Sequence, residues 1–378
     1  MRNEWTTVPL GELCDVLDSK RKPITKRDRE AGEYPYYGAT GIKDYVSGYI
    51  FDEPLVLVGE DGAKWASGDQ TAFAVEGKCW VNNHAHVLRP HRTRLIDNWL
   101  IHFFFFSDLS EFVSGLTVPK LNQGNLREIP IPLPPLAEQQ RIVGLLDEAF
   151  EGLATAKANA QKNLQNARAL FESHLQSVFT QRGPGWVEKK VSEIAKHSLG
   201  KMLDKAKNKG EPKPYLRNIN VRWFAFDLSD LLQMPFLPSE EEKYTAIKGD
   251  VLICEGGYPG RAAIWDEDYP IYFQKALHRV RFQEPELNKW FVYYLSVQDS
   301  SGQLKQHFSG TGIQHFTGEV LARFLIPVPP LTELRRAVAK FDALSEETQR
   351  LARLYEQKLA ALEALKKSLL HQAFTGEL

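Results

Sequence analysis

The chain has 378 residues, 43% of them apolar and 25% charged, with a net charge of −1, values typical of a soluble globular protein with two or more domains. No apolar run reaches the ~18 residues of a membrane-spanning helix, and the N-terminus lacks an apolar export segment, so no membrane partner is expected. Cys14, Cys79 and Cys254 are scattered, which fits a reducing cytoplasm and excludes a disulfide framework and a thiolate zinc site.

Residues 1–133 form the first predicted globular domain. Short β-like runs such as residues 55–58, Gly- and Pro-rich turns and an amphipathic helix after Trp99 predict an α+β fold. The domain ends in the sequence IPIPLPP, where proline removes backbone donors and favours extended chain.

A long helix is predicted next, within residues 134–181. From Leu136 to about Phe179 it would span ~66 Å. Apolar or small residues recur at alternating spacings of three and four, which predicts a heptad seam. The expected seam consists of Leu146, Ala149, Leu153, Ala156, Ala160, Asn163, Ala167, Leu170 and His174.

The rest of the chain repeats this order. A shift of 195 residues lays PPLAEQQ, which begins at Pro134, on PPLTELR, which begins at Pro329, and the match holds without a gap for nearly fifty residues. Near the start of each globular segment the shift is 181, because the second segment carries about fourteen extra residues. We therefore expect a tandem duplication with a second domain at 182–328 and a second helix at 329–378.

The two helices are expected to pair as an antiparallel coiled coil that relates the two domains by a pseudo-twofold axis. Such symmetry would suit duplex DNA. A polar residue, Asn163 or Lys358, interrupts each seam at the same point, which can fix register. The alternative is that each helix packs on its own domain. The second seam consists of Phe341, Leu344, Thr348, Leu351, Tyr355, Lys358, Leu362, Leu365 and Leu369.

Two basic segments point to DNA although the net charge does not. Residues 20–29 contain six Lys or Arg against one acid, residues 201–209 contain four against one, and their starts differ by 181. Equivalent basic segments in both domains predict a shared phosphate-binding role, with a purely solvated surface as the alternative. The basic candidates are Lys20, Arg21, Lys22, Lys26, Arg27, Lys201, Lys205, Lys207 and Lys209.

Further candidates lie in loops of the first domain, where amides, hydroxyls and cations could contact base edges or phosphates. For each of them a turn or surface role is an equal alternative. These candidates are Tyr36, Tyr37, Asn82, Asn83, His84, Lys120 and Asn122.

No catalytic motif emerges. EGGYPG at 255–260 lacks the ending of a phosphate-binding loop, and the histidines have no company at metal-ligand spacing, so no metal site is expected. Glu-x-Lys triplets at 188–190 and 211–213 resemble nuclease fragments, but they are expected by chance in a chain this rich in charge.

The doubled PPLxE before a long helix, together with the terminal LEALKKSLLHQAFTGEL, resembles the specificity subunit of type I restriction-modification systems. The resemblance implies that each globular domain reads half of a bipartite, asymmetric DNA target. It also implies that the helices set the gap and dock two methyltransferase subunits, which hold S-adenosylmethionine and methylate adenine N6. Restriction subunits would add ATP- and Mg²⁺-dependent cleavage, and this chain would bind no cofactor. The rival hypotheses are an enzyme that modifies or cuts DNA alone, and a coiled-coil adaptor that never touches DNA.

Overall fold

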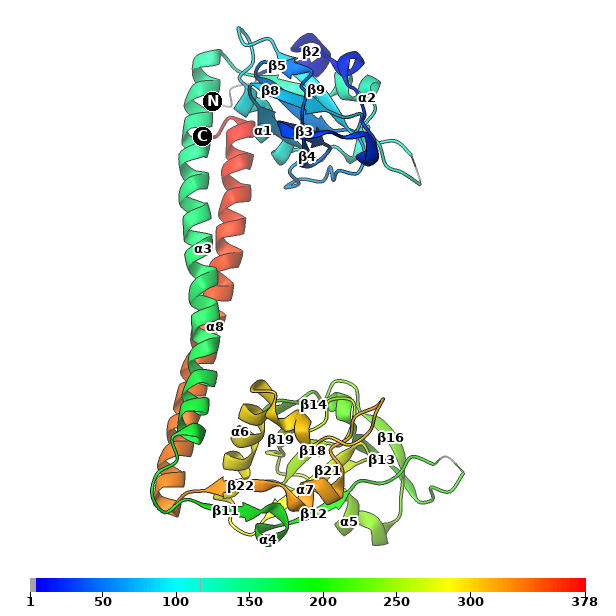
Figure 1. Ribbon diagram of the computed structural model, residues 1–378, viewed down its shortest axis with the longest axis vertical. Helices are drawn as coiled ribbons and strands as arrows, with labels where there is room; N and C mark the ends of the chain where they lie inside the picture. The colour runs from blue at the N-terminus through cyan, green and yellow to red at the C-terminus, as the bar shows by residue number, and fades with distance from the viewer. Residues whose placement is uncertain (1–4, 116, 205) are drawn as a thin grey trace. The chain divides into compact units, whose positions relative to one another are not determined.

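The structure is a computed structural model that describes residues 5–115, 117–204 and 206–378. It divides into two compact units: unit 1 comprises residues 1–162 and 355–378, and unit 2 comprises residues 163–354. The division falls within two long helices, α3 (Leu136–Thr180) and α8 (Leu331–Thr375) (Figure 1). Each unit therefore contains one globular part and a segment of both helices.

The globular part of unit 1 packs helix α1 against one four-stranded sheet, which in turn packs against a second. The strand orders are β2-β9-β6-β7 and β4-β3-β8-β5, and β1 pairs with β10 beside them. The elements are β1 (Thr6–Pro9), β2 (Cys14–Val16), β3 (Ala31–Gly38), β4 (Gly41–Val46), β5 (Phe51–Asp52), β6 (Leu55–Gly59), β7 (Ala72–Val75), β8 (Lys78–Val81), β9 (Ala85–Pro90), α1 (Asp97–Phe106), α2 (Gln123–Glu128) and β10 (Pro130–Leu133).

Unit 2 repeats this topology, with strand orders β12-β21-β18-β19 and β16-β13-β20-β17, the pair β11-β22, and an additional hairpin, β14-β15. The repeated strand orders confirm the expected duplication. The elements are β11 (Val187–Lys190), α4 (Val191–Ile194), β12 (Ala195–Leu199), β13 (Glu211–Leu216), β14 (Val221–Arg222), β15 (Ala225–Phe226), β16 (Leu232–Phe236), α5 (Glu241–Tyr244), β17 (Thr245–Ala246), β18 (Val251–Cys254), β19 (Ala262–Ile264), β20 (Ile271–Phe273), β21 (Leu277–Phe282), α6 (Glu286–Ser300), α7 (Gly318–Arg323) and β22 (Leu325–Val328).

The central strand of each unit is buried on both faces. In β6, Val56 and Val58 pack into the core beneath α1, whereas Leu55 and Leu57 pack into the core between the two sheets. A strand covered on both faces needs a continuous apolar run rather than an alternating one. The equivalent strand β18 divides its four buried residues between two cores in the same way.

Each long helix starts beside one globular part and ends against the other. The Phe374 ring of α8 packs on Trp99 of α1 at a centroid distance of 4.7 Å, and the Phe179 ring of α3 packs on Trp290 of α6 at 4.6 Å. Both tryptophans also donate to a proline carbonyl at the exit of their own domain, Trp99 to Pro132 at 2.9 Å. These aromatic contacts attach the arriving helix to each domain.

The helices α3 and α8 contact each other antiparallel within each unit, as expected. In unit 1, Lys157 forms an ion pair with Glu363, and in unit 2, His174 packs edge-on against Phe341. Both helices are 45 residues long and they start 195 residues apart. None of the helices in the described parts of the chain is long and apolar enough to cross a membrane.

The structure corrects the expected seam at its middle. Asn163 and Lys358 are exposed, and Leu164 and Leu359, one residue later, are the shielded residues. Consecutive seam residues there are separated by three, four and four positions, where the expected heptad pattern had three, four and three. The three spacings add up to an eleven-residue repeat, and such a repeat locally relaxes the left-handed supercoil. For the same reason two leucines expected in the seam are outside it, Leu170 at 53% exposed and Leu365 at 48%.

Candidate nucleic-acid interface

The basic segment of unit 1 is held in place by hydrogen bonds between its backbone and the side chains of neighbouring strands. Trp80 Nε1 donates to the Lys22 carbonyl at 2.6 Å, and the Ile24 amide donates to the Tyr36 hydroxyl at 3.0 Å. The backbone is thus ordered without burying most of the charge, which suits phosphate contact. The exposed cations are Lys20, Lys22, Lys26 and Arg27.

Arg21 differs from these neighbours because its side chain is only 12% exposed. Its guanidinium pairs with Asp18 at 3.2 Å and with Glu60, and it donates to the Ala85 carbonyl at 2.9 Å. Glu60 also pairs with Lys120 at 2.7 Å. Arg21 therefore ties the basic segment to the ends of β6 and β9.

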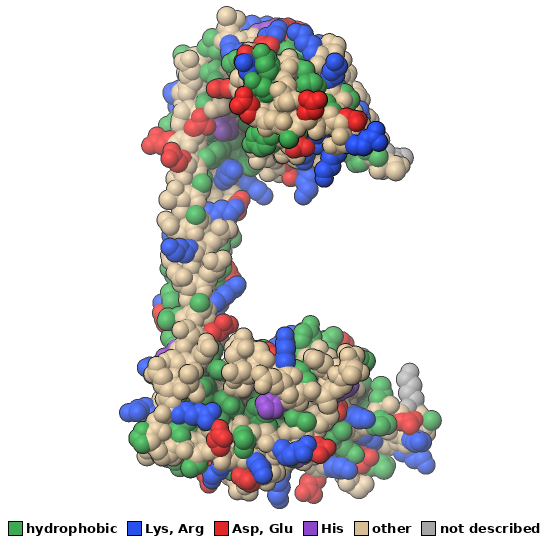
Figure 2. All heavy atoms as spheres, viewed as in Figure 1, with side chains coloured by type: hydrophobic (Ala, Val, Ile, Leu, Met, Phe, Trp, Pro, Cys, Tyr) green, Lys and Arg blue, Asp and Glu red, His purple; other side chains and the backbone are tan. Residues whose placement is uncertain are grey.

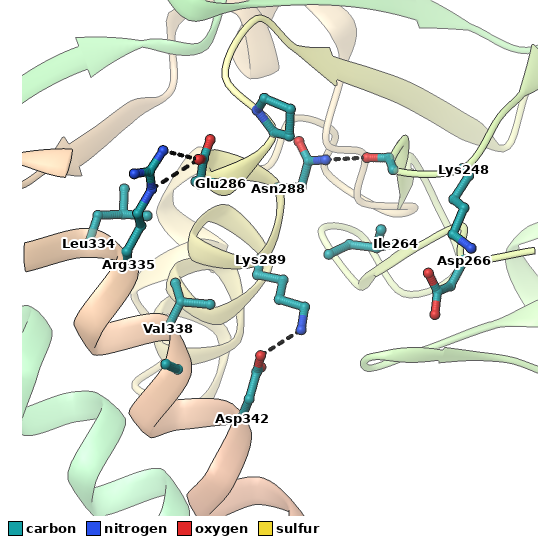
Figure 3. Close-up of a pocket in the computed structure, with 13 residues that line it drawn as sticks. Lys248, Ile264, Asp266, Glu286, Asn288, Lys289, Leu334, Arg335, Val338 and Asp342 are labelled. Carbon is teal, nitrogen blue, oxygen red and sulfur yellow. Dashed lines mark hydrogen bonds and ion pairs between the residues drawn. The ribbon is translucent and has the colours of Figure 1, made fainter. Parts of the chain in front are cut away.

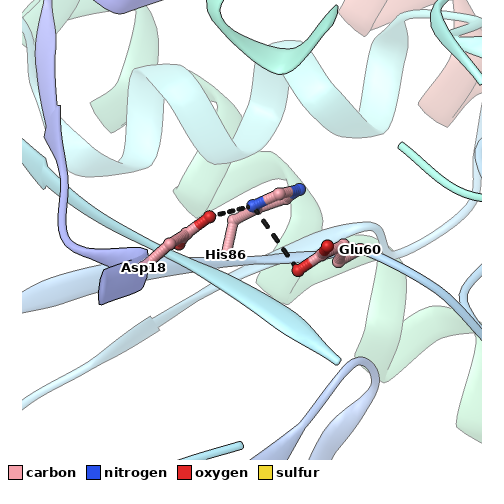
Figure 4. Close-up of side chains that lie close together, drawn as sticks. All are labelled: Asp18, Glu60 and His86. Atoms are coloured by element: carbon pink, nitrogen blue, oxygen red, sulfur yellow. Dashed lines mark hydrogen bonds and ion pairs between the residues drawn. The ribbon is translucent and has the colours of Figure 1, made fainter. Parts of the chain in front are cut away.

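His86 completes this ion-pair cluster (Figure 4). Its buried ring places Nδ1 2.6 Å from the Asp18 carboxylate and Nε2 2.7 Å from the Leu121 carbonyl, so both nitrogens face oxygen acceptors. The ligand atoms of Asp18, Glu60 and His86 lie within 4.8 Å of one another, as in a metal site. Because Arg21 and Lys120 already neutralise these carboxylates, we interpret the cluster as an anchor for the basic segment.

The partners of both carboxyls favour ionisation. Burial raises the pKa of Asp18, but the hydrogen bond from His86 and the charges of His86 and Arg21 outweigh it, so this pKa lies below its usual value. Burial likewise raises the pKa of Glu60, and hydrogen bonds from Lys120 and Arg21 bring it below the usual value. Both groups are therefore carboxylates at neutral pH.

The basic segment of unit 2 also has one buried cation. Lys201, which is 6% exposed, pairs with Glu240 at 2.6 Å, donates to the Pro235 carbonyl at 2.8 Å and lies over the Phe236 ring. Lys207 and Lys209 are exposed, and Lys207 lies 3.7 Å from Asp204. Lys205, the remaining candidate of this segment, lies outside the described residues.

Several amide and aromatic candidates have structural partners. The Tyr36 side chain is 1% exposed, and the buried Asn82 accepts the His84 amide at 2.8 Å. Asn122 caps α2 by accepting the Asn125 amide at 2.9 Å. Tyr37 is half-buried, and its ring lies 5.8 Å from the Phe73 ring. Asn83 and His84 are exposed, His84 beside Asp61, and Lys120 is partly exposed.

The Glu-x-Lys triplets do not form a nuclease centre. Glu211 pairs with Lys213 of its own triplet at 2.7 Å, and Glu188 pairs with Arg182 at 2.8 Å. These side chains are largely exposed, so the pairs are surface ion pairs.

One carboxylate on each long helix was missed as a candidate site residue. In unit 1, Asp147 of α3 accepts from His102 of α1 at 2.8 Å; in unit 2, Asp342 of α8 accepts from Tyr293 of α6 at 2.6 Å. Lys289 contacts the same Asp342 at 2.5 Å and borders a pocket of about 560 Å³ between α6 and α8 (Figure 3). The sequence did carry a signal for these residues, because Asp147 and Asp342 occupy the same position of the 195-residue repeat. Their contacts fix each domain on the long helix that follows it.

Positive charge is local rather than general. Figure 2 shows Lys and Arg side chains interspersed with Asp and Glu on the visible face of each unit. Contact with a polyanion would therefore depend on the exposed parts of the two basic segments.

Comparisons with known proteins agree with the duplication. The family description "Type I restriction modification DNA specificity domain" matches residues 2–165 and again residues 184–363. A putative type I restriction enzyme specificity subunit of Haemophilus influenzae is 28% identical, with 97% of this chain and 95% of the relative covered. A type I restriction enzyme specificity subunit of Methanocaldococcus jannaschii is 21% identical, with 99% and 93% covered.

Two solved structures share the fold. A chain of a type I restriction-modification system, solved to explain complex assembly and conformational transition, has a TM-score of 0.73 at 20% identity, with 100% of this chain and 99% of that chain covered. An HsdS subunit from Thermoanaerobacter tengcongensis has a TM-score of 0.63 at 20% identity, with 100% and 98% covered.

Proposed function

The chain belongs to the type I restriction-modification specificity subunits and carries two DNA specificity domains in tandem, and from this premise we propose that each globular part reads one half of a bipartite, asymmetric DNA target. The repetition of one strand topology in two units, each joined to the same two helices, is the observation that carries the proposal. Two independent readers on one chain suit a target whose halves differ in sequence.

In this proposal α3 and α8 set the length of the unread DNA between the halves. The observation behind it is that each helix is 45 residues long, continuous and packed on the other. The helices also dock two methyltransferase subunits, and restriction subunits join the same complex. The chain itself catalyses no step and binds no cofactor. The methyltransferase subunits hold S-adenosylmethionine, the restriction subunits use ATP and Mg²⁺, and the complex acts in the cytoplasm.

Reconstitution tests this division of roles. The purified chain, separately purified methyltransferase subunits, and the two combined would each be given DNA and radiolabelled S-adenosylmethionine. We expect sequence-specific methyl transfer to adenine only in the combination. Methyl transfer or cleavage by the chain alone would make it an enzyme, and equal methylation without the chain would contradict a recognition role.

Replacing Lys22, Lys26 and Arg27 by alanine should weaken DNA binding by the methyltransferase complex and make that binding less salt-dependent. If all three side chains contact phosphates, the slope of log K against log salt should fall by about 2.7. The measurement is a titration of labelled DNA at several salt concentrations. Lys162→Ala, an exposed position on α3, serves as the control and should leave the slope unchanged. An unchanged slope in the triple variant would remove this segment from the interface.

A further inference from the structure

Two loops, residues 114–120 in unit 1 and 309–315 in unit 2, present an exposed apolar side chain at equivalent positions. Val118 is 64% exposed and Ile313 is 74% exposed, and the two lie 195 residues apart. Ile313 is the most exposed large apolar side chain among the described residues. Isolated exposed apolar residues are common, but the same position in two units with otherwise different loop sequences calls for a shared cause.

The described residues of each loop are held in one shape. Ser114 and Lys120 exchange two backbone hydrogen bonds of 2.9 and 2.8 Å, and Ser309 and His315 exchange two of 2.9 Å. Gly115 and Gly310 follow the two serines at φ +96° and +103°. A Cβ on Gly115 would lie 2.5 Å from the Val118 carbonyl, and one on Gly310 would lie 2.3 Å from the Ile313 carbonyl. Glycine is therefore required for both loops to close beneath the apolar residue.

Each loop is anchored on the same strand end of its unit. Leu121 donates its amide to the Glu60 carbonyl at 2.8 Å, and Phe316 donates to the Glu255 carbonyl at 2.7 Å. In Figure 1 the orange chain around residues 309–315 extends beyond the sheets of its unit. A fixed loop loses little conformational entropy when it binds a partner.

The surroundings of the loops favour a nucleic acid over a protein partner. In unit 1, Lys120 at the foot of the loop pairs with Glu60, which pairs with Arg21 of the basic segment. In unit 2, a Cβ on Gly256 would lie 3.2 Å from the His315 ring, and in the same 255–261 loop Arg261 stacks on the 64% exposed Tyr258 at 4.1 Å. A partly exposed lysine at the foot of one loop, and an arginine stacked on an exposed tyrosine in a loop that reaches the foot of the other, are groups that can hold phosphates and bases.

We propose that Val118 and Ile313 are base-contacting residues, each pressing its apolar side chain against bases of the half-site that its unit reads. This inference rests on the proposed function. Apolar side chains contact DNA bases either at the thymine methyl group or by entering a base step. Both modes bury the same apolar surface and neither releases a counterion.

The test uses the complete methyltransferase complex and its own target DNA. Val118→Ala should weaken binding roughly 10-fold and Ile313→Ala up to about 50-fold, because two and three carbon atoms are lost from an apolar contact. The salt slope should stay that of the wild type, unlike the slope of the Lys22, Lys26 and Arg27 variant. Val187→Ala and Ile247→Ala, exposed residues of the same types outside the loops, should bind as the wild type does.

Two DNA modifications distinguish the modes of contact. If the contact is to a methyl group, replacing the contacted thymine by uracil should weaken DNA binding by the wild-type complex. The same replacement should leave DNA binding by the Val118→Ala complex unchanged. A 2-aminopurine at the contacted step should brighten with the wild type and not with the variant if the side chain enters the stack. Either pattern supports a base contact.

Alanine variants that bind the target as tightly as the wild type would overturn this inference and leave the proposed function standing. Loss of a methyltransferase subunit from the variant complexes would also overturn it, because the loops would then contact protein. A wild-type complex without any bipartite target would overturn the proposed function and this inference together.

Discussion

Removing residues 167–173 from α3 together with residues 345–351 from α8 is expected to abolish methylation of the native target. The deletion removes facing heptads and shortens both helices by about 10 Å, near three base-pair steps. Seven residues fall only about 20° short of two full helical turns, so the deletion hardly rotates one end of the helix relative to the other. Removing three base pairs, in contrast, rotates one end of the DNA relative to the other by about 100°. The domains would then meet the native half-sites at the wrong spacing and angle, and affinity should fall toward the non-specific level, about 10³-fold or more.

The deletion leaves the seam of both helices in register, so helix pairing should persist and can be checked by circular dichroism. Glu172→Gln combined with Glu346→Gln changes two exposed positions in the same segments without changing length, and this variant should methylate normally. Methylation is measured on a set of targets whose unread gaps differ in length. If the shortened chain still supported full methylation of targets with the original gap, the helices would not set the spacing between the half-sites.

Arg21→Met is expected to destabilise unit 1 by about 1.5–3 kcal/mol, because it removes the cation that Asp18 and Glu60 share and leaves Asp18 with His86 and Glu60 with Lys120. The Asp18 and Glu60 side chains are only 6% and 8% exposed, so water replaces the lost partner poorly. Chemical denaturation of the chain measures the effect. Lys22→Met, at the next and exposed position, should stay within about 0.5 kcal/mol of the wild type.

The effect of Arg21→Met should depend on pH. Asp18 and Glu60 have lowered pKa values in the folded chain, so their stabilisation is present above the unfolded values and is lost as pH falls through the folded ones. The difference between wild type and variant should therefore narrow below about pH 4. Adding Glu60→Gln to Arg21→Met should cost less than the sum of the single changes. An Arg21→Met chain as stable as Lys22→Met would mean that the cluster does not anchor the segment.

The duplicated architecture could be predicted from the sequence because its signals are local. Proline exits, an apolar run and a long amphipathic pattern recur at nearly fixed shifts, and each of them acts through neighbouring residues. The middle of the seam could not be predicted in the same way. Asn163 and Leu164 both continue the pattern, at spacings of three and four from Ala160, and only the facing helix selects the leucine.

The candidate site was predicted less completely because its partners are distant in sequence. The charge of the basic segments identified the exposed lysines. It did not show that Arg21 and Lys201 are buried, because each pairs with a glutamate 39 residues away, Glu60 and Glu240 respectively. Nothing local distinguishes a cation with such a partner from one left in water. Val118 and Ile313 carried a readable signal, a branched apolar residue three positions after a Ser-Gly pair in both halves, which became meaningful once both side chains proved exposed.

The most direct test of two domains reading two half-sites is single-molecule sequencing of modified bases in DNA from cells that carry the complete system. We expect methylated adenines in two short, different sequence blocks on opposite strands, separated by an unread gap of constant length, and their loss when this chain is deleted. A single continuous recognition block, or methylation that persists without the chain, would contradict the account.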